Sequence, residues 1–143
     1  MDSFEISAWF DADPTTVFGA WTDPHQHAAF TGGGATGAAV PGQAFTAWDG
    51  YITGIWLRID PDQGFAQSWR TSEFADGDAD ALLEITMRRD GRGTELTLRH
   101  SNLPAGEGDR YRQGWVDHYF DPLTDWLANG RPSGPTESNG RQA

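Results

Sequence analysis

His100 is the residue whose type and position could most readily support chemistry in this chain. It follows Leu96 and Leu98 at two-residue spacing, so the three side chains share one face of an expected strand. An imidazole titrates near neutral pH, and His100 could therefore donate a proton or anchor a ligand through a hydrogen bond. The alternative is a partly buried histidine whose hydrogen-bonding needs are met by a neighbouring side chain.

Arg112 is the second candidate, because a helical wheel places it near the inward face of a long amphipathic helix. A guanidinium at the mouth of a pocket could pair with a ligand carboxylate. A buried arginine without a partner is not tolerated. The alternative is therefore a side chain that reaches solvent or forms an ion pair.

The remaining titratable residues do not form a pattern that indicates catalysis. His25 and His27 are two residues apart, which does not put both on one helical face, and no third ligand is apparent. Glu84 and Glu95 point outward by strand alternation, so we expect no carboxylate pair for acid–base work. We therefore predict no catalytic residue, no metal and no cofactor.

Aromatic residues supply most of the pocket that we expect instead. Their rings could either fill the space between a helix and a sheet or line a cavity there, and a wet cavity would satisfy their polar atoms. The predicted ligand-pocket residues are Trp48, Tyr51, Trp69, Met87, Leu98, His100, Arg112, Trp115, Tyr119 and Trp126.

A long helix from Glu107 to Asn129 is the element that must position many of these side chains. Asp117, Asp121 and Asp125 form one stripe with Ala128, and the opposite side carries Trp115, Val116, Tyr119, Leu123, Trp126 and Leu127. Such a division predicts a helix that lies with one side on a core. Pro122 removes a backbone donor, so we expect a kink there and not an end.

The rest of the chain reads mainly as strands, which this helix must cover. Asp-Pro pairs at residues 13–14 and 23–24 predict two short helices, to about Trp21 and to Phe30. The glycine-rich residues 31–42 predict a mobile loop beside a pocket. Alternating apolar residues predict strands at 3–11, 44–48, 51–59, 65–71, 83–88 and 94–101. We expect one domain over residues 1–130 and a disordered tail over 131–143.

Composition excludes several classes of function. The chain of 143 residues has a net charge of −11, which repels nucleic-acid phosphates and anionic membranes. It has no cysteine, and all ten of its basic residues are arginine, so disulfides, thiolate chemistry and Schiff-base catalysis are ruled out. No apolar run approaches the length of a transmembrane helix, and the N-terminal residues lack a signal-peptide pattern. We expect a cytoplasmic protein.

Three segments in this order resemble the activator of heat shock protein 90 ATPase family. They are WDGYITGIWLRIDPDQGFAQSWR at 48–70, TELTLRHSNLP at 94–104 and GWVDHYFDPL at 114–123. The chain is similar to the C-terminal domain of these proteins and to their single-domain bacterial relatives. The resemblance implies the α+β helix-grip fold of the START-like, or SRPBCC, superfamily. In that birch-pollen-allergen-like fold, a curved antiparallel sheet wraps around a long C-terminal helix and two short helices follow the first strand.

The resemblance implies functions that range from ligand carriers to co-chaperones and enzymes. We expect a domain that binds a small hydrophobic or aromatic ligand between the sheet and the C-terminal helix. The first alternative is a protein-interaction module that regulates a chaperone ATPase in the stress response. The second is a small enzyme of the cyclase or hydrolase kind that uses His100 and an ordered water. The sequence leaves the oligomeric state open.

Overall fold

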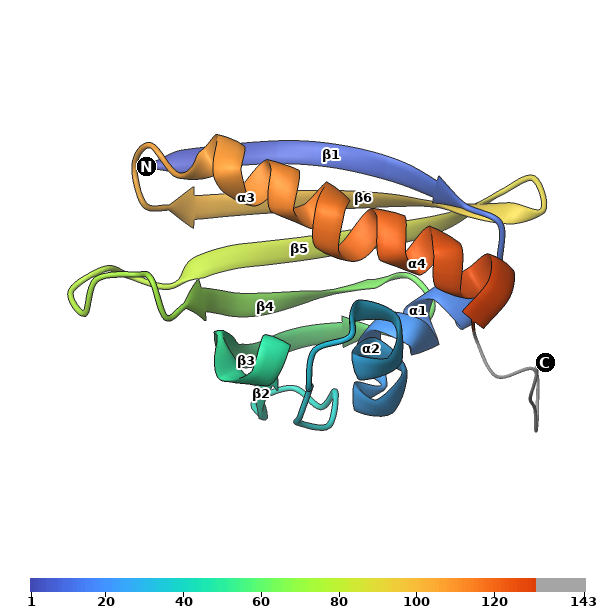
Figure 1. Cartoon of the computed structure of the whole chain (residues 1–143), viewed down its shortest axis with the longest axis horizontal. Helices are drawn as coiled ribbons and strands as arrows, with labels where there is room; N and C mark the ends of the chain where they lie inside the picture. The colour runs from blue at the N-terminus through green and yellow to red at the C-terminus, as the bar shows by residue number, and fades with distance from the viewer. Residues whose placement is uncertain (131–143) are drawn as a thin grey trace.

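The computed structural model describes residues 1–130, so the tail predicted at 131–143 lies outside the described residues. A single antiparallel sheet and a long C-terminal helix make up most of the described chain (Figure 1). The elements in chain order are β1 (Asp2–Phe10), α1 (Pro14–Thr22), α2 (Pro24–Thr31), β2 (Ala44–Ala47), η1 (Trp48–Gly50), β3 (Ile52–Asp60), β4 (Gly64–Thr71), β5 (Ala81–Asp90), β6 (Gly93–Leu103), α3 (Gly108–Trp115), η2 (Val116–Phe120), α4 (Asp121–Asp125) and η3 (Trp126–Gly130).

The six strands are ordered β1-β6-β5-β4-β3-β2, and each is antiparallel to its neighbours. Apolar side chains alternate along them, so one face is buried and the other carries polar groups. Phe4, His100 and Leu83 lie side by side across three strands of the buried face. The predicted α+β helix-grip architecture is confirmed.

Both short helices begin where the Asp-Pro pairs predict. The side chain of Asp13 accepts a hydrogen bond from the backbone N–H of Thr16 at 2.8 Å, and that of Asp23 accepts one from His25 at 2.9 Å. Pro14 and Pro24 occupy the first helical positions, where a backbone donor is not needed. These caps turn the chain back after β1, so that α1 and α2 pack beside one end of the sheet (Figure 1).

The C-terminal helix runs through Pro122 without ending, as predicted, because Phe120 and Asp121 keep right-handed helical dihedrals. Just before Pro122 the helix widens into a π turn, in which the N–H of Asp121 donates to the carbonyl of Val116, and the kink expected at Pro122 stays a prediction. A π turn holds more residues than the 3.6 of an α-helix. Residues Tyr111, Trp115, Tyr119 and Leu123 recur every four positions and are all buried.

This widened turn explains why a uniform helical wheel places Arg112 too close to the inward face, whereas the structure agrees with the alternative that its side chain reaches solvent. On a uniform wheel of about 100° per residue, residues four positions apart are offset by roughly 40° around the helix axis. The buried residues then spread over a wide arc, and Arg112 falls near the middle of that arc. The π turn slows the rotation and keeps the four-residue stripe facing the sheet. Arg112 is therefore exposed on the helix, at the side of the buried stripe.

The core lies between this helix and the buried face of the sheet. Leu83, Ile85, Leu96 and Leu98 are fully buried there, and Leu123 meets them from the helix side of the core cluster. Among residues 1–130, no helix is long and apolar enough to cross a membrane.

The structure corrects the prediction around Trp48. The strand predicted to end at Trp48 ends at Ala47, and Trp48 begins a left-handed turn with φ 51°, followed by Asp49 with φ 58°. The turn still joins β2 to β3 as an antiparallel pair. Its different shape moves the Trp48 ring off the strand and toward the C-terminal helix.

Candidate functional site: an aromatic cavity beneath the C-terminal helix

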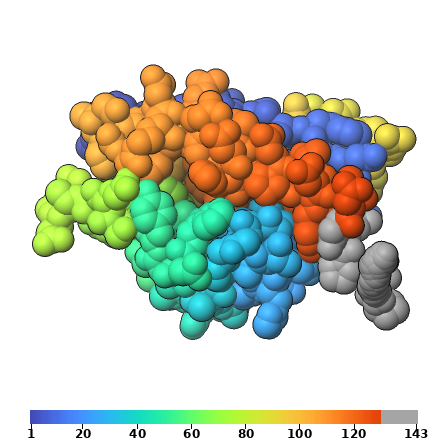
Figure 2. Space-filling model, viewed as in Figure 1, coloured from blue at the N-terminus to red at the C-terminus, as the bar shows by residue number. Residues whose placement is uncertain are grey.

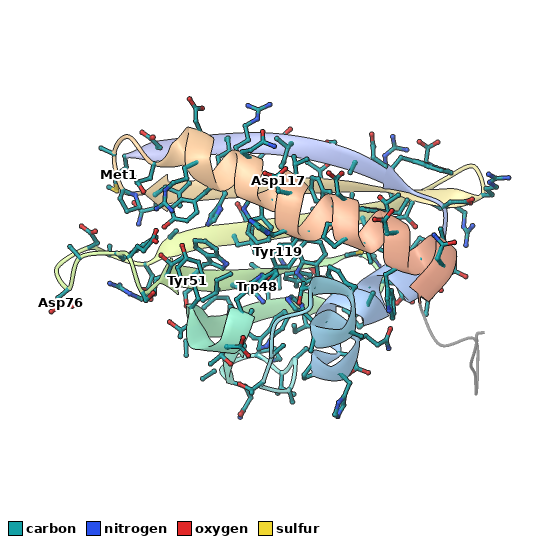
Figure 3. The ribbon with its side chains drawn as sticks, viewed as in Figure 1. Met1, Trp48, Tyr51, Asp76, Asp117 and Tyr119 are labelled. Carbon is teal, nitrogen blue, oxygen red and sulfur yellow. The ribbon has the colours of Figure 1, made fainter. Side chains whose placement is uncertain are left out.

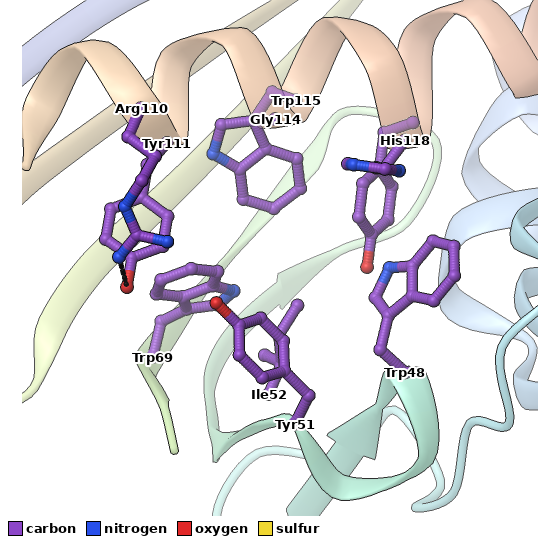
Figure 4. A pocket seen from close by; sticks show the side chains of 10 residues that line it. Trp48, Tyr51, Ile52, Trp69, Arg110, Tyr111, Gly114, Trp115 and His118 are labelled. Atoms are coloured by element: carbon purple, nitrogen blue, oxygen red, sulfur yellow. Dashed lines mark hydrogen bonds between the residues drawn. The ribbon is translucent and has the colours of Figure 1, made fainter. Parts of the chain in front are cut away.

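A cavity of about 440 Å³ lies between the first half of the C-terminal helix and the β3–β4 end of the sheet. Figure 2 shows the surface of the helix meeting that of the η1 region along one seam of the molecule, and Figure 3 places Trp48 and Tyr51 across from Tyr119. The cavity is lined by Trp48, Tyr51, Ile52, Trp69, Arg110, Tyr111, Gly114, Trp115, His118 and Tyr119 (Figure 4).

Half of the residues predicted for a pocket line this cavity. They are Trp48, Tyr51, Trp69, Trp115 and Tyr119. Trp48 belongs to η1, Tyr51 to the junction between η1 and β3, and Trp69 to β4, while Trp115 and Tyr119 belong to the C-terminal helix. The fold therefore brings together side chains up to 71 positions apart in the sequence.

The other five predicted residues lie elsewhere. Met87 and Leu98 are buried in the core beneath the helix, and Arg112 is exposed. Trp126 lines a shallow groove beside α2 and is not part of the aromatic cavity. His100, the fifth, is fully buried and does not line the cavity either.

His100 is held behind the cavity wall. The indole Nε1 of Trp115 donates a hydrogen bond to its Nδ1 at 3.0 Å, so the neutral ring carries its proton on Nε2. Within the described structure, Nε2 has no hydrogen-bond partner. Burial lowers the pKa of His100 to about 3. The imidazole is therefore neutral at physiological pH and supports the position of Trp115.

A chain of hydrogen bonds runs from the cavity into the protein through Tyr119. The Nε2 atom of His27 lies 3.0 Å from the Tyr119 hydroxyl, and its Nδ1 lies 2.8 Å from the carbonyl of Trp21. Because a carbonyl can only accept, Nδ1 carries the proton and Tyr119 donates to Nε2. The Trp48 indole also acts on the Tyr119 hydroxyl and lowers its pKa, against the larger effect of burial. Burial lowers the pKa of His27 and raises that of Tyr119, so both groups are uncharged.

The rim of the cavity contains a cluster of charges that the sequence analysis missed. Arg110 Nη1 lies 2.6 Å from Glu73, and the same guanidinium pairs with Glu107. Its Nη2 also donates to the Tyr111 hydroxyl at 3.1 Å. The Tyr51 hydroxyl donates to Glu73 at 3.2 Å. The pKa of Arg110 is raised, first by its hydrogen bond to Glu107. The spacing of Glu107 and Arg110 by three helical positions was the available signal.

The glycine-rich loop supports the cavity from behind instead of lining it. The N–H of Asp49 donates to the carbonyl of Gly34, and the N–H of Gly34 donates to the Asp49 carboxylate, each at 3.0 Å. A Cβ on Gly33 would lie 2.6 Å from the Trp48 ring. A left-handed tryptophan is unusual and costs energy. The loop and Tyr119 together hold Trp48 in that conformation at the cavity wall.

In the described residues, no group of three or more histidine or acidic side chains is placed to hold a metal ion. His27, one of the two histidines considered above, has both ring nitrogens engaged by Trp21 and Tyr119. The cavity therefore presents aromatic surface with a few hydrogen-bonding groups.

An antiparallel sheet that holds a long C-terminal helix, with an aromatic cavity between them, defines a helix-grip domain. A family model described as "Activator of Hsp90 ATPase homolog 1-like protein" matches residues 11–128, and the chain belongs to this family. The resemblance seen in the sequence is thereby confirmed.

Individual relatives agree with this assignment. Over 121 residues the chain is 29% identical to the activator of 90 kDa heat shock protein ATPase homolog 1 of Mus musculus, a match that spans 85% of this chain and 36% of the mouse protein. An HSP90 activator from Plasmodium falciparum has the same fold, with a TM-score of 0.80, 24% identity and coverage of 88% of this chain and 96% of its own. CalU16 from Micromonospora echinospora superposes with a TM-score of 0.76 at 25% identity, covering 89% of this chain and 76% of its own.

Proposed function

We propose that this domain binds a small, uncharged aromatic molecule in the cavity beneath the C-terminal helix. The observation that carries the proposal is the cavity itself, which encloses about 440 Å³ between aromatic walls. Ligand sites in proteins have volumes of roughly 300–1,000 Å³ and combine apolar walls with a few polar groups. Planar rings can lie against Trp48, Tyr51 and Trp115, which border the cavity on different sides (Figure 4).

The charges at the rim favour a ligand without a carboxylate. Arg110 is the cation nearest to the cavity among the lining residues, and it is already paired with both Glu73 and Glu107. A ligand carboxylate would have to compete with two side chains that are already in place. The rim as a whole carries one positive and two negative charges, so an anionic ligand is disfavoured.

Gly114 provides a direct test, because it lines the cavity and an added Cβ meets no atom within 4 Å. Gly114→Leu should fill the cavity while it also favours the helix, since leucine has the higher helix propensity. Flavone should raise the melting temperature of the wild-type protein with increasing concentration and quench its tryptophan emission. The Gly114→Leu variant should show neither effect.

Gln113→Leu is the matched control, because it adds the same side chain at a neighbouring exposed position. It should bind flavone like the wild type. Dodecanoate should give no shift with any of the three proteins, because the rim disfavours a carboxylate. Equal flavone responses from wild type and Gly114→Leu would show that binding occurs outside the cavity and would overturn the proposal.

A protein-interaction role is the second candidate, and the family supports it. Relatives of this chain are activators of the 90 kDa heat shock protein ATPase, although the chain spans only 36% of the length of the mouse protein. The third possibility, a small enzyme that uses His100, gains nothing from the geometry, because His100 does not line the cavity.

A further inference from the structure

Most polar groups in the cavity wall already have hydrogen-bond partners. The Tyr51 hydroxyl donates to Glu73, and Tyr119 bonds to His27. The Tyr111 hydroxyl lies 2.9 Å from the Thr71 hydroxyl. These groups contribute little to ligand specificity, because each would have to break an existing hydrogen bond before it could bind a ligand.

Two groups that line the cavity form no hydrogen bond within the described structure: the exposed imidazole of His118 and the indole nitrogen of Trp69. The Trp69 side chain is only 3% exposed. Figure 4 shows the nitrogen edge of the Trp69 ring turned toward the space between Tyr51 and Trp48. An indole N–H can donate but cannot accept. A donor that faces the cavity without a protein partner is free to bond to a ligand that supplies an acceptor.

The Trp69 ring is also fixed in place, so the donor points in one direction. It packs edge-to-face against His100, with ring centroids 4.4 Å apart, and against Tyr111 at 5.4 Å. The Trp115 ring packs against the Trp69 ring with centroids 5.8 Å apart, and the hydrogen bond from Trp115 to His100 holds Trp115 in place. A donor fixed by neighbouring rings loses little entropy when it binds, which favours specific recognition.

We propose that the ligand carries a carbonyl oxygen that accepts a hydrogen bond from Trp69 Nε1, so that its class is an uncharged aromatic ketone or quinone. This inference rests on the proposed function, since it names the chemistry of a ligand in the same cavity. The aromatic walls select flat rings, the paired rim disfavours carboxylates, and the indole N–H of Trp69, which has no protein partner, selects an acceptor.

Two ligands that share a ring skeleton test the inference. Fluorenone and fluorene differ at one ring carbon, which is a carbonyl in fluorenone and a methylene in fluorene. We would measure the dissociation constant of each by tryptophan quenching with the wild type and with Trp69→Phe. The preference for fluorenone over fluorene should fall about 3- to 10-fold in the variant, the range expected for one hydrogen bond. Trp9→Phe is the matched control and should leave the preference unchanged, because Trp9 lies outside the cavity and its nitrogen donates to the Asp90 carbonyl.

A second measurement does not require a variant that folds. In protein labelled with ¹⁵N, fluorenone should move one indole proton downfield, and that proton should show nuclear Overhauser contacts to the bound ligand and to the Tyr51 ring. Fluorene should not cause this shift. If both ligands bind and neither test distinguishes them, the ketone assignment is overturned while the cavity proposal stands. If neither ligand binds the wild type, the cavity proposal itself fails.

Discussion

Histidines buried as neutral rings link the stability of this protein to pH. His27 and His100 lie in the core, and burial is the main reason that the pKa of each is lowered. The native state therefore resists protonation of these rings, whereas the unfolded chain takes up protons near pH 6.5. Neither ring is suited to act as a proton donor at neutral pH. Their structural role is to accept hydrogen bonds from Trp115 and Tyr119.

We predict that acid weakens the fold before most carboxylates titrate. Below pH 6.5 His100 is protonated in the unfolded state, whereas in the native state it stays neutral down to about pH 3. The free energy of unfolding therefore rises with pH across this window and is lost as pH falls. Between pH 7.5 and pH 5.0 the loss from His100 alone should be about 2 kcal/mol. Urea unfolding at the two pH values measures it. His100→Gln keeps an acceptor for Trp115 and should reduce the loss; an unchanged loss would contradict the assignment.

At the scale of single residues, the sequence predicted which face a side chain takes but not its place along that face. Alternation correctly turned Met87, Leu98 and His100 toward the helix, where they are buried. A period of two residues carries no information on where the helix leaves a gap. The gap lies over β3 and β4, so Trp69 borders it while Met87 does not. The pairing of His27 with Tyr119 joins residues 92 positions apart and had no signal in the sequence.

At the scale of elements, local rules predicted the caps and strands, and close contacts between elements decided the rest. The Asp-Pro pairs and the alternating strands depend on neighbours in sequence, so they could be read directly. The left-handed Trp48 could not, because it depends on the loop around Gly33 and on Tyr119. The widened turn before Pro122 could not be read either, because a uniform helical wheel assumes the same rotation at every residue.

Gly54 in β3 provides a test of close strand packing. A Cβ at this position would lie 1.9 Å from the carbonyl oxygen of Ser68 and 2.7 Å from the Phe45 ring. Since a backbone carbonyl in a central strand cannot move aside cheaply, Gly54→Ala should destabilise the protein by about 3 kcal/mol or more. Gly77→Ala is the control, because an added Cβ there meets nothing within 4 Å, and it should change stability by no more than about 0.5 kcal/mol. Equal unfolding midpoints in urea for the two variants would show that the strands are more loosely packed than the structure indicates.

At the scale of the whole molecule, the outer surface is strongly acidic while the interior is aromatic. The net charge is −11, and the exposed side of the C-terminal helix carries Asp117, Asp121 and Asp125. Such a surface favours partners with positive charge, and salt weakens attraction of this kind. The cavity, by contrast, has rim charges that are paired with one another. A ligand role and a surface role therefore involve different parts of the molecule and can be tested separately.

We predict that this chain stimulates the ATPase of heat shock protein 90 weakly or not at all. The charge of the molecule is the reason for this prediction, because a net charge of −11 repels an acidic partner surface. The acidic surface also offers no lysine to a partner. A coupled ATPase assay with the chaperone from the same organism measures the effect at low micromolar protein. Several-fold stimulation would contradict the prediction and favour the co-chaperone role. In that case, Asp117→Asn, Asp121→Asn and Asp125→Asn combined would show whether the acidic stripe makes the contact, and Gly114→Leu would show whether the cavity takes part.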